Sequence, residues 1–103
     1  MEYIFEKNRI YVNNDQGKMI IESTFPFYKE HTVVINHTYV DPALRGKGVA
    51  SQLMNKTCDY IKEQGYKMVA TCPYAVVWLK RHHAYDDILD LEEQAKLSPE
   101  CQI

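Results

Sequence analysis

The stretch from Val40 to Leu53 decides the fold, and it reads VDPALRGKGVASQL. A run of β-forming residues stops at the Asp-Pro pair, and a helical pattern begins around the Gly-Lys-Gly segment. Glycines at a strand-to-helix junction allow backbone N–H groups to converge on an anion. The helix N-terminus adds a partial positive charge, and Arg45 and Lys47 add full ones. The stretch therefore predicts a phosphate or pyrophosphate site, with an ordinary glycine-rich turn as the alternative.

Two common nucleotide motifs are absent from this stretch. No Gly-Lys-Ser/Thr stands at the spacing of a Walker loop, and the pattern Gly-x-Gly-x-x-Gly does not occur. A phosphate at this junction would therefore be bound in a different manner.

The composition excludes several classes of protein. The 103 residues are enough for one small domain, and 46% hydrophobic with 25% charged residues is typical of a globular chain. A formal net charge of −2 argues against nucleic-acid and anionic-membrane binding. No apolar run approaches the ~20 residues of a membrane span, and the N-terminus lacks the pattern of a signal peptide. Three cysteines without metal-ligand spacing predict reduced thiols in a cytoplasmic protein and no metal site.

The first half of the chain reads as a meander of antiparallel strands. The predicted strands are residues 3–8, 9–13, 18–27 and 32–40, with turns at 13–17 and 28–30. In the last of these strands, strict alternation places four side chains on one face, namely Val33, Ile35, His37 and Tyr39.

The second half changes to a helical period. Apolar residues recur at spacings of four over residues 46–64, and Gly65 is suited to end that helix. Residues 67–71 predict a strand parallel to 32–40, residues 74–82 a second helix, and residues 84–91 a last strand. The result is an α+β fold in one domain, residues 1–94, with a mixed, mostly antiparallel sheet, helices packed on it, and a polar tail at 95–103.

This order of elements resembles the GNAT superfamily of acyl-CoA N-acyltransferases. Its pyrophosphate loop, Gln/Arg-x-x-Gly-x-Gly/Ala, is matched by Arg45, Gly48 and Ala50. The sequence HTYV at 37–40 resembles the His-Thr-x-Val strand end of a minimal, cysteine-containing branch of that superfamily. TCPY at 71–74 resembles the cysteine motif of the branch, and Tyr85 with two following aspartates resembles its terminal tyrosine segment.

The resemblance implies acetyl-CoA as cosubstrate and no metal. Two parallel strands would splay apart, and the backbone of Thr38, Tyr39 and Val40 would pair with the pantetheine arm. The pyrophosphate would lie on the loop residues Arg45, Gly46, Lys47, Gly48, Val49 and Ala50. The acyl acceptor would be a primary amine, either a lysine or N-terminus of a protein or peptide, or a small amine. The N-terminal region shows only strand and turn patterns, so the acceptor side should be open in a monomer or completed in a homodimer.

Cys72 is the residue with the largest mechanistic consequence. The resemblance places it beside the thioester, where a thiolate could accept the acetyl group and pass it on. The alternative is that Cys72 lines the pocket or packs as a small apolar residue while the amine attacks directly. Cys58, on the apolar face of the helix, is expected in the core.

His37 is the candidate base, with a structural hydrogen bond as the alternative. Tyr39 stands where some relatives carry a glutamate, so the strand offers no carboxylate. Tyr74, Trp78 and Tyr85 are candidates for the acceptor pocket or for simple core packing. The missing carboxylate keeps a second reading open, that of a non-catalytic CoA-binding or protein-interaction module.

Overall fold

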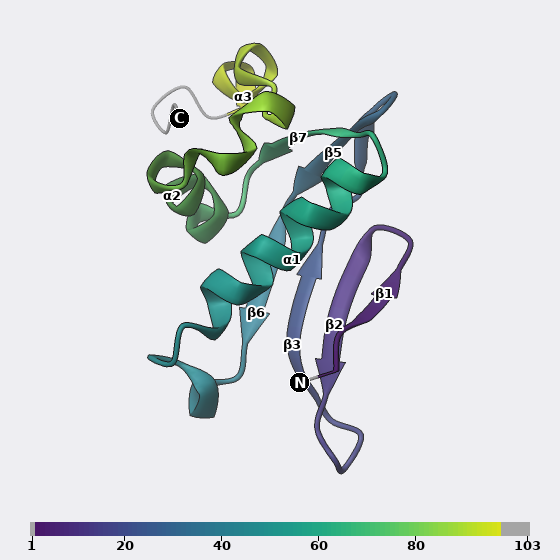
Figure 1. Ribbon diagram of the computed structural model, residues 1–103, viewed down its shortest axis with the longest axis vertical. Coiled ribbons are helices and arrows are strands. Elements are labelled where there is room, and N and C mark those ends of the chain that lie inside the picture. Colours follow the sequence, from purple (N-terminus) through teal and green to yellow (C-terminus); the bar gives the residue numbers. More distant parts are fainter. Residues whose placement is uncertain (1, 98–103) are drawn as a thin grey trace.

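The computed structural model describes residues 2–97, and within them strands form two sheets that are covered by helices (Figure 1). One sheet has the strand order β1-β2-β3-β6 and is antiparallel, and the other has the order β4-β5-β7. The strands are β1 Ile4–Glu6, β2 Arg9–Asn13, β3 Met19–Thr24, β4 Phe27–Lys29, β5 Thr32–Ile35, β6 His37–Val40 and β7 Lys67–Ala70. The helices are η1 Pro42–Leu44, α1 Val49–Glu63, α2 Pro73–Arg81, η2 His83–Ile88 and α3 Leu91–Leu97. The predicted α+β class with mostly antiparallel sheets is confirmed.

The predicted single strand over residues 32–40 is wrong, because the chain breaks at Asn36. β5 pairs in parallel with β7, whereas β6 pairs antiparallel with β3. At the break, the Ile35 carbonyl accepts the N–H groups of both Thr71 and Cys72, at 3.0 and 3.1 Å. The parallel pairing therefore ends at this point, and β6 and β7 belong to different sheets, which agrees with the splayed strands that the resemblance implies.

The same break changes which side chains are buried. Val33 and Ile35 are fully buried, but His37 is exposed and Tyr39 only half-buried. The prediction that these four residues share one face is wrong. An irregular residue in a strand offsets the two-residue alternation, so the residues beyond Asn36 turn to other faces.

Among the other strands, β2 agrees with the prediction and β3 differs from it at its end. β2 matches the expected residues 9–13, while β3 stops at Thr24 instead of continuing to residue 27. The turn predicted at 28–30 is wrong, since Phe27–Lys29 form β4 and the turn falls at Glu30 and His31.

Helix α1 packs on the β1-β2-β3-β6 sheet and on β7 through one apolar stripe. The stripe consists of Val49, Leu53, Met54, Thr57, Cys58 and Ile61. The helix begins at Val49 rather than at the predicted residue 46, because Gly46 and Gly48 have positive φ angles of 84° and 74°. That left-handed backbone cannot continue a helix. No helix among residues 2–97 has the length and apolarity needed to cross a membrane.

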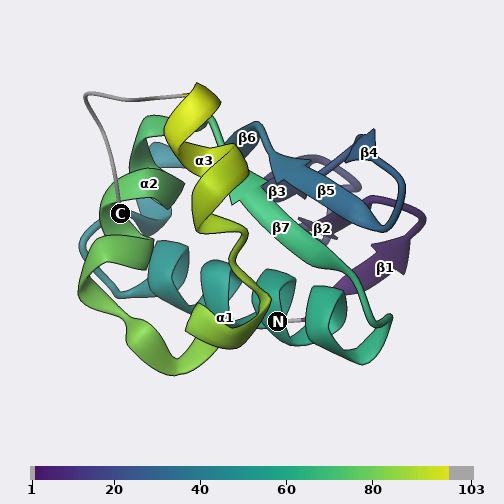
Figure 2. The same ribbon diagram turned by 90° about the horizontal axis from the view of Figure 1, so that it is seen from above.

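The strand predicted at 84–91 is wrong, since the chain there forms the short helix η2 and then α3. Figure 2 shows α3 beside the outer edge of β7. Leu89 alone makes a bridge to Met68, and the Asp90 N–H donates to the Met68 carbonyl at 2.9 Å. α3 runs through residue 94, so the expected domain boundary at 94/95 falls inside a helix, and residues 98–103 of the expected tail lie outside the described residues.

Gln94 joins α3 to the end of β7. Its Nε2 donates to the Ala70 carbonyl at 2.8 Å, and its Oε1 accepts the Ala70 N–H at 2.6 Å. The side chain is 1% exposed. The buried amide thus occupies the position that another strand would take beside β7.

Candidate active site

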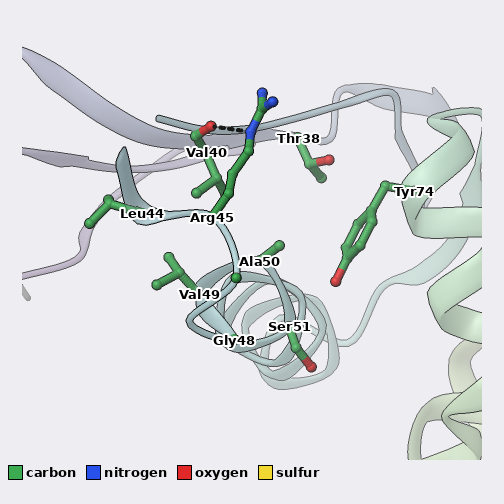
Figure 3. Close-up of a pocket in the computed structure, with 10 residues that line it drawn as sticks. Thr38, Val40, Leu44, Arg45, Gly48, Val49, Ala50, Ser51 and Tyr74 are labelled. Carbon is green, nitrogen blue, oxygen red and sulfur yellow. Dashed lines mark hydrogen bonds between the residues drawn. The ribbon is translucent and has the colours of Figure 1, made fainter. Parts of the chain in front are cut away.

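A cavity of about 430 Å³ lies between β6, the start of α1 and the start of α2 (Figure 3). Nine of its ten lining residues come from the continuous stretch 38–51, and the tenth, Tyr74, comes from α2. The lining residues are Thr38, Val40, Leu44, Arg45, Gly46, Gly48, Val49, Ala50, Ser51 and Tyr74. Most of the residues predicted to bind the cofactor are therefore brought together, whereas Tyr39 and Lys47 are not among those that line the cavity.

The loop between β6 and α1 forms part of the wall of this cavity. Asp41 Oδ1 accepts the Ala43 N–H at 2.9 Å and fixes the short helix η1 at the start of the loop. The N-cap of α1 is Gly48, which offers no side chain to the first-turn N–H groups. The first turn of a helix leaves its N–H groups without intrahelical partners. Those of Val49, Ala50 and Ser51 thus belong to residues of the cavity wall.

The two glycines of the loop are needed for their backbone conformation. A Cβ placed on Gly46 or Gly48 would meet nothing within 4 Å, so crowding does not exclude a side chain. Their positive φ angles do, because L-residues other than Gly rarely adopt them. Alternating backbone conformations of this kind form concave sites for anions.

β6 presents part of its backbone to the gap between the splayed strands. Since the Asp41 N–H bonds to the Ile20 carbonyl at 2.8 Å, the antiparallel alternation directs the N–H and C=O of Tyr39 toward β3. The same alternation directs those of Thr38 and Val40 toward the gap. Arg45 Nε donates to the Val40 carbonyl at 3.4 Å. Thr38 and Val40, rather than Tyr39, therefore have the backbone groups that a bound molecule can reach.

Cys72 lies at the N-cap of α2, against the cavity wall. Its Sγ is 3.3 Å from the Thr38 hydroxyl, and the residue is 8% exposed. Cys58 instead lies in the core, where its thiol donates to Met68 Sδ at 3.8 Å and burial raises its pKa to about 12. Cys72 is thus the described cysteine that contacts a lining residue.

The three predicted acceptor-pocket aromatics have different surroundings. Tyr74 lines the cavity, and its hydroxyl points toward the start of α1 (Figure 3). Trp78 is 4% exposed and donates its indole N–H to Ser51 Oγ at 2.9 Å. The Tyr85 hydroxyl donates to Asp59 Oδ1 at 2.8 Å, and burial followed by this hydrogen bond raises its pKa. Trp78 and Tyr85 attach α2 and η2 to α1 and are not among the lining residues.

Ser51 and Leu44 line the cavity although no motif singles them out. Both adjoin the glycine loop, Leu44 on the strand side and Ser51 on the helix side. Their proximity to the loop in sequence is the signal that could have identified them.

His37 belongs to a network on the sheet face opposite α1. Its Nε2 is 3.2 Å from Glu22 Oε1, and Arg9 Nε donates to Glu22 Oε2 at 2.6 Å. The guanidinium of Arg9 lies 3.8 Å from the centre of the Tyr11 ring. The hydrogen bond to Glu22 is the main cause that raises the pKa of Arg9. The sequence pattern does not single out Glu22, because only the register of β3 against β6 brings it beside His37.

Comparison with known proteins assigns the chain to a family. Residues 9–88 match the model of the family described as GCN5-related N-acetyl-transferase. The chain belongs to this family. Among residues 2–97, no group of three or more His, Cys, Asp or Glu side chains could hold a metal ion.

Relatives of this GCN5-related domain include curated and solved proteins. This chain is 31% identical over 58 residues to Protein NATD1 of Xenopus tropicalis. The match covers 56% of this chain and 53% of the relative. The chain thus matches about half the length of that relative. The solution structure of a GCN5-like protein from Staphylococcus aureus superposes with a TM-score of 0.72 at 27% identity, covering 86% of this chain and 87% of the other. Tetrahymena GCN5 shares the fold, with a TM-score of 0.59 at 19% identity over 89% of this chain and 61% of the other.

Proposed function

We propose that this GCN5-related domain binds acetyl-CoA in the cavity and transfers the acetyl group to a primary amine. One observation carries the proposal: a single cavity is lined both by the first turn of α1, which has no side-chain cap among residues 2–97, and by Thr38 and Val40 of β6, the edge strand of its sheet in that part of the chain. The helix turn suits a pyrophosphate, and the strand edge suits the amides of a pantetheine arm. Acetyl-CoA contains both groups in one molecule.

The pyrophosphate is assigned to the loop. The helix N-terminus stabilises negative charge, and Arg45 adds a positive charge at the wall of the cavity. Lys47 is exposed in the same loop and adds a second positive charge beside the cavity. Gly46 and Gly48 allow the backbone to curve around the phosphates.

The pantetheine arm is assigned to the edge of β6. An extended chain with amide groups adds to a strand edge by backbone hydrogen bonds. Thr38 and Val40 direct their backbone groups to that edge, as the register with β3 requires. An arm bound in this way carries the thioester past Thr38 and toward Cys72.

Two routes for the acetyl group remain open. In direct transfer the amine attacks the thioester, and a backbone N–H of the β6 edge near Val40 stabilises the tetrahedral oxyanion. In the covalent route the Cys72 thiolate first takes the acetyl group and releases CoA. Mass measurement of the intact protein after incubation with acetyl-CoA alone separates the routes. An acetyl adduct that Cys72→Ala lacks supports the covalent route, and near-normal turnover of Cys72→Ser without an adduct supports direct transfer.

A second candidate is a CoA-binding module without turnover. Among residues 2–97, those that line the cavity include no carboxylate and no histidine. Time-resolved release of CoA in the presence of lysine peptides, peptide N-termini and small amines distinguishes the two. Release that depends on the amine supports the enzyme, and tight binding of CoA without release supports the module.

The phosphate assignment has its own test. Calorimetry with CoA and with pantetheine, which lacks the phosphates, should show a clear preference for CoA. Equal affinity for both ligands would contradict the assignment of the pyrophosphate to residues 45–50.

A further inference from the structure

The carboxylate of Glu22 on β3 lies between the side chains of Arg9 on β2 and His37 on β6. Its two oxygens engage different partners, Oε1 the imidazole of His37 and Oε2 the guanidinium of Arg9. The Glu22 side chain is 16% exposed, whereas that of His37 is 49% exposed. The carboxylate is therefore held in place by the sheet, and the imidazole is open to solvent on its other side.

The contact fixes which nitrogen of His37 can take up a proton. In a neutral imidazole one nitrogen is a donor and the other an acceptor. Because Nε2 faces an ionised carboxylate, Nε2 carries the hydrogen, and Nδ1 is left as the acceptor. His37 thus presents an unprotonated nitrogen away from Glu22.

His37 lies on the face of β6 that is turned away from the cavity. The side chain of Thr38 lines the cavity, and the side chain of the preceding residue, His37, lies on the opposite face of β6. Helix α1 packs against β3 and β6, and the side chain of His37 is 49% exposed. An amine that reached a thioester beside Thr38 from the other face of β6 would pass His37 and Glu22.

We propose that Glu22 is a positioning residue that orients His37 as the proton acceptor for the amine, an inference that rests on the proposed function. A protonated amine gives one proton to Nδ1 of His37. The neutral nitrogen then bonds to the acetyl carbon, and the C–S bond breaks with its electron pair on the sulfur. The second N–H proton goes to the CoA thiolate, and the exposed imidazolium returns its proton to water.

The charged groups around His37 define the expected pH behaviour. The imidazole of His37 faces Glu22 of β3. On the other side of that carboxylate lie Arg9 and Tyr11 of β2 and Glu6 of β1. Tyr39 follows on β6. Replacement of Glu22 removes the anion that supports the imidazolium and leaves the cation of Arg9 nearby.

The chain offers a matched control for the test. Glu6 also contacts Arg9, at 3.1 Å, and accepts from the Tyr11 hydroxyl at 3.3 Å, but it makes no contact with His37. Turnover of acetyl-CoA with a lysine-containing peptide and with spermidine is followed by chromatography of released CoA. Glu22→Gln should lower kcat about tenfold and His37→Gln about 100-fold, at the lower end of general-base effects. The double variant should equal His37→Gln, and Glu6→Gln should equal the wild type.

The pH profile separates positioning from a merely structural role. In His37→Gln the ascending limb of kcat/KM against pH should disappear. In Glu22→Gln the limb should persist, with kcat/KM below that of Glu6→Gln at every pH, because an imidazole that is held less firmly accepts the proton less often. A Glu22→Gln profile that coincides with that of Glu6→Gln would overturn the inference while the proposed function stands.

Nitrogen NMR of the imidazole tests the pairing without any turnover. The signal of His37, assigned by its loss in His37→Gln, should show the Nε2–H tautomer at alkaline pH. The Nδ1–H tautomer would overturn the inference. A protein that binds CoA but releases none with any amine contradicts the proposed function, and the proton-accepting role of His37 with it.

Discussion

β6 and β7 diverge from the same point, and each has one edge paired with a neighbouring strand. Their other edges differ. The outer edge of β7 is closed by the chain itself, through the Asp90 N–H and the buried amide of Gln94. The free edge of β6 borders the cavity, and the described contact there is the long one from Arg45 to the Val40 carbonyl. A closed edge contributes to stability, and an open edge beside a cavity is available to a ligand.

The largest effect is expected where the open edge meets the glycine loop. Gly48→Val places a β-branched residue at a φ of +74°, which costs roughly 1–3 kcal/mol of strain if the loop keeps its shape. Relaxation of the loop would misdirect the N–H groups, so affinity for CoA should fall on the order of 100-fold, since every 1.4 kcal/mol is a factor of ten. Calorimetry with CoA measures the loss.

Gly17→Val is the matched control for this variant. Gly17 has a φ of +78° and equally open space around its Cβ position, but it lies in the turn between β2 and β3. Both variants should lose similar stability, and only Gly48→Val should lose CoA binding. Equal affinity of the two variants would remove the loop from the binding site.

The closed edge is tested by Gln94→Leu. This change leaves the N–H and C=O of Ala70 buried without partners, and each such group costs about 1–3 kcal/mol. The free energy of unfolding should fall by about 2–6 kcal/mol in urea denaturation. Gln52→Leu, on the exposed face of α1, should change it little. If both variants unfold at the same urea concentration, the amide of Gln94 does not close the edge.

The two described cysteines, Cys58 and Cys72, should differ in reactivity as the closed edge of β7 and the open edge of β6 differ. Cys58 lies behind β7 and its pKa is about 12, so at pH 8 only about one thiol in 10,000 is ionised. Cys72 lies against the open edge of β6. Iodoacetamide at pH 8 should therefore modify Cys72 before Cys58 in the native protein, and saturating CoA should slow the reaction. Peptide mapping identifies the modified residue, and prior modification of Cys58 would contradict the prediction.

The smallest effect is expected for Glu93 of α3, whose carboxylate pairs with Lys29 and Lys96. Lys29 first, then Lys96, lowers the pKa of the Glu93 carboxyl below its usual range. A carboxyl with a lowered folded-state pKa stabilises the fold above its unfolded pKa. That contribution is lost as the pH falls through the folded-state pKa. Wild type should therefore lose more stability between pH 7 and pH 3 than Glu93→Gln, as measured by urea midpoints. Identical losses in the two proteins would contradict the role of Glu93.

Local signals in the sequence predicted the glycine loop and helix α1 better than they predicted the pairing of the strands. The glycine loop and the body of helix α1 follow from the residues themselves, because turn chemistry and apolar spacing act over a few positions, although the helix starts at Val49 and not at residue 46. The break at Asn36 depends on which strands β5 and β6 pair with, and no periodicity within residues 32–40 records that choice. No local pattern places Glu22 beside His37 either. Gln94 likewise contacts Ala70 although 24 residues separate them in the sequence. Contacts set by register and by tertiary packing were therefore beyond prediction from the sequence.

The bond from Trp78 to Ser51 gives the protein an optical property. The chain contains one tryptophan, and its indole N–H is tied to a hydroxyl in the first turn of α1, at the wall of the cavity. The ring is also stacked on His82, with centroids 4.1 Å apart. Indole emission depends on the polarity and hydrogen bonding around the ring, so any occupant that shifts Ser51 changes the fluorescence of the whole molecule. The native chain thus carries an unlabelled reporter of its own cavity, suited to stopped-flow measurement of how fast a ligand enters and leaves.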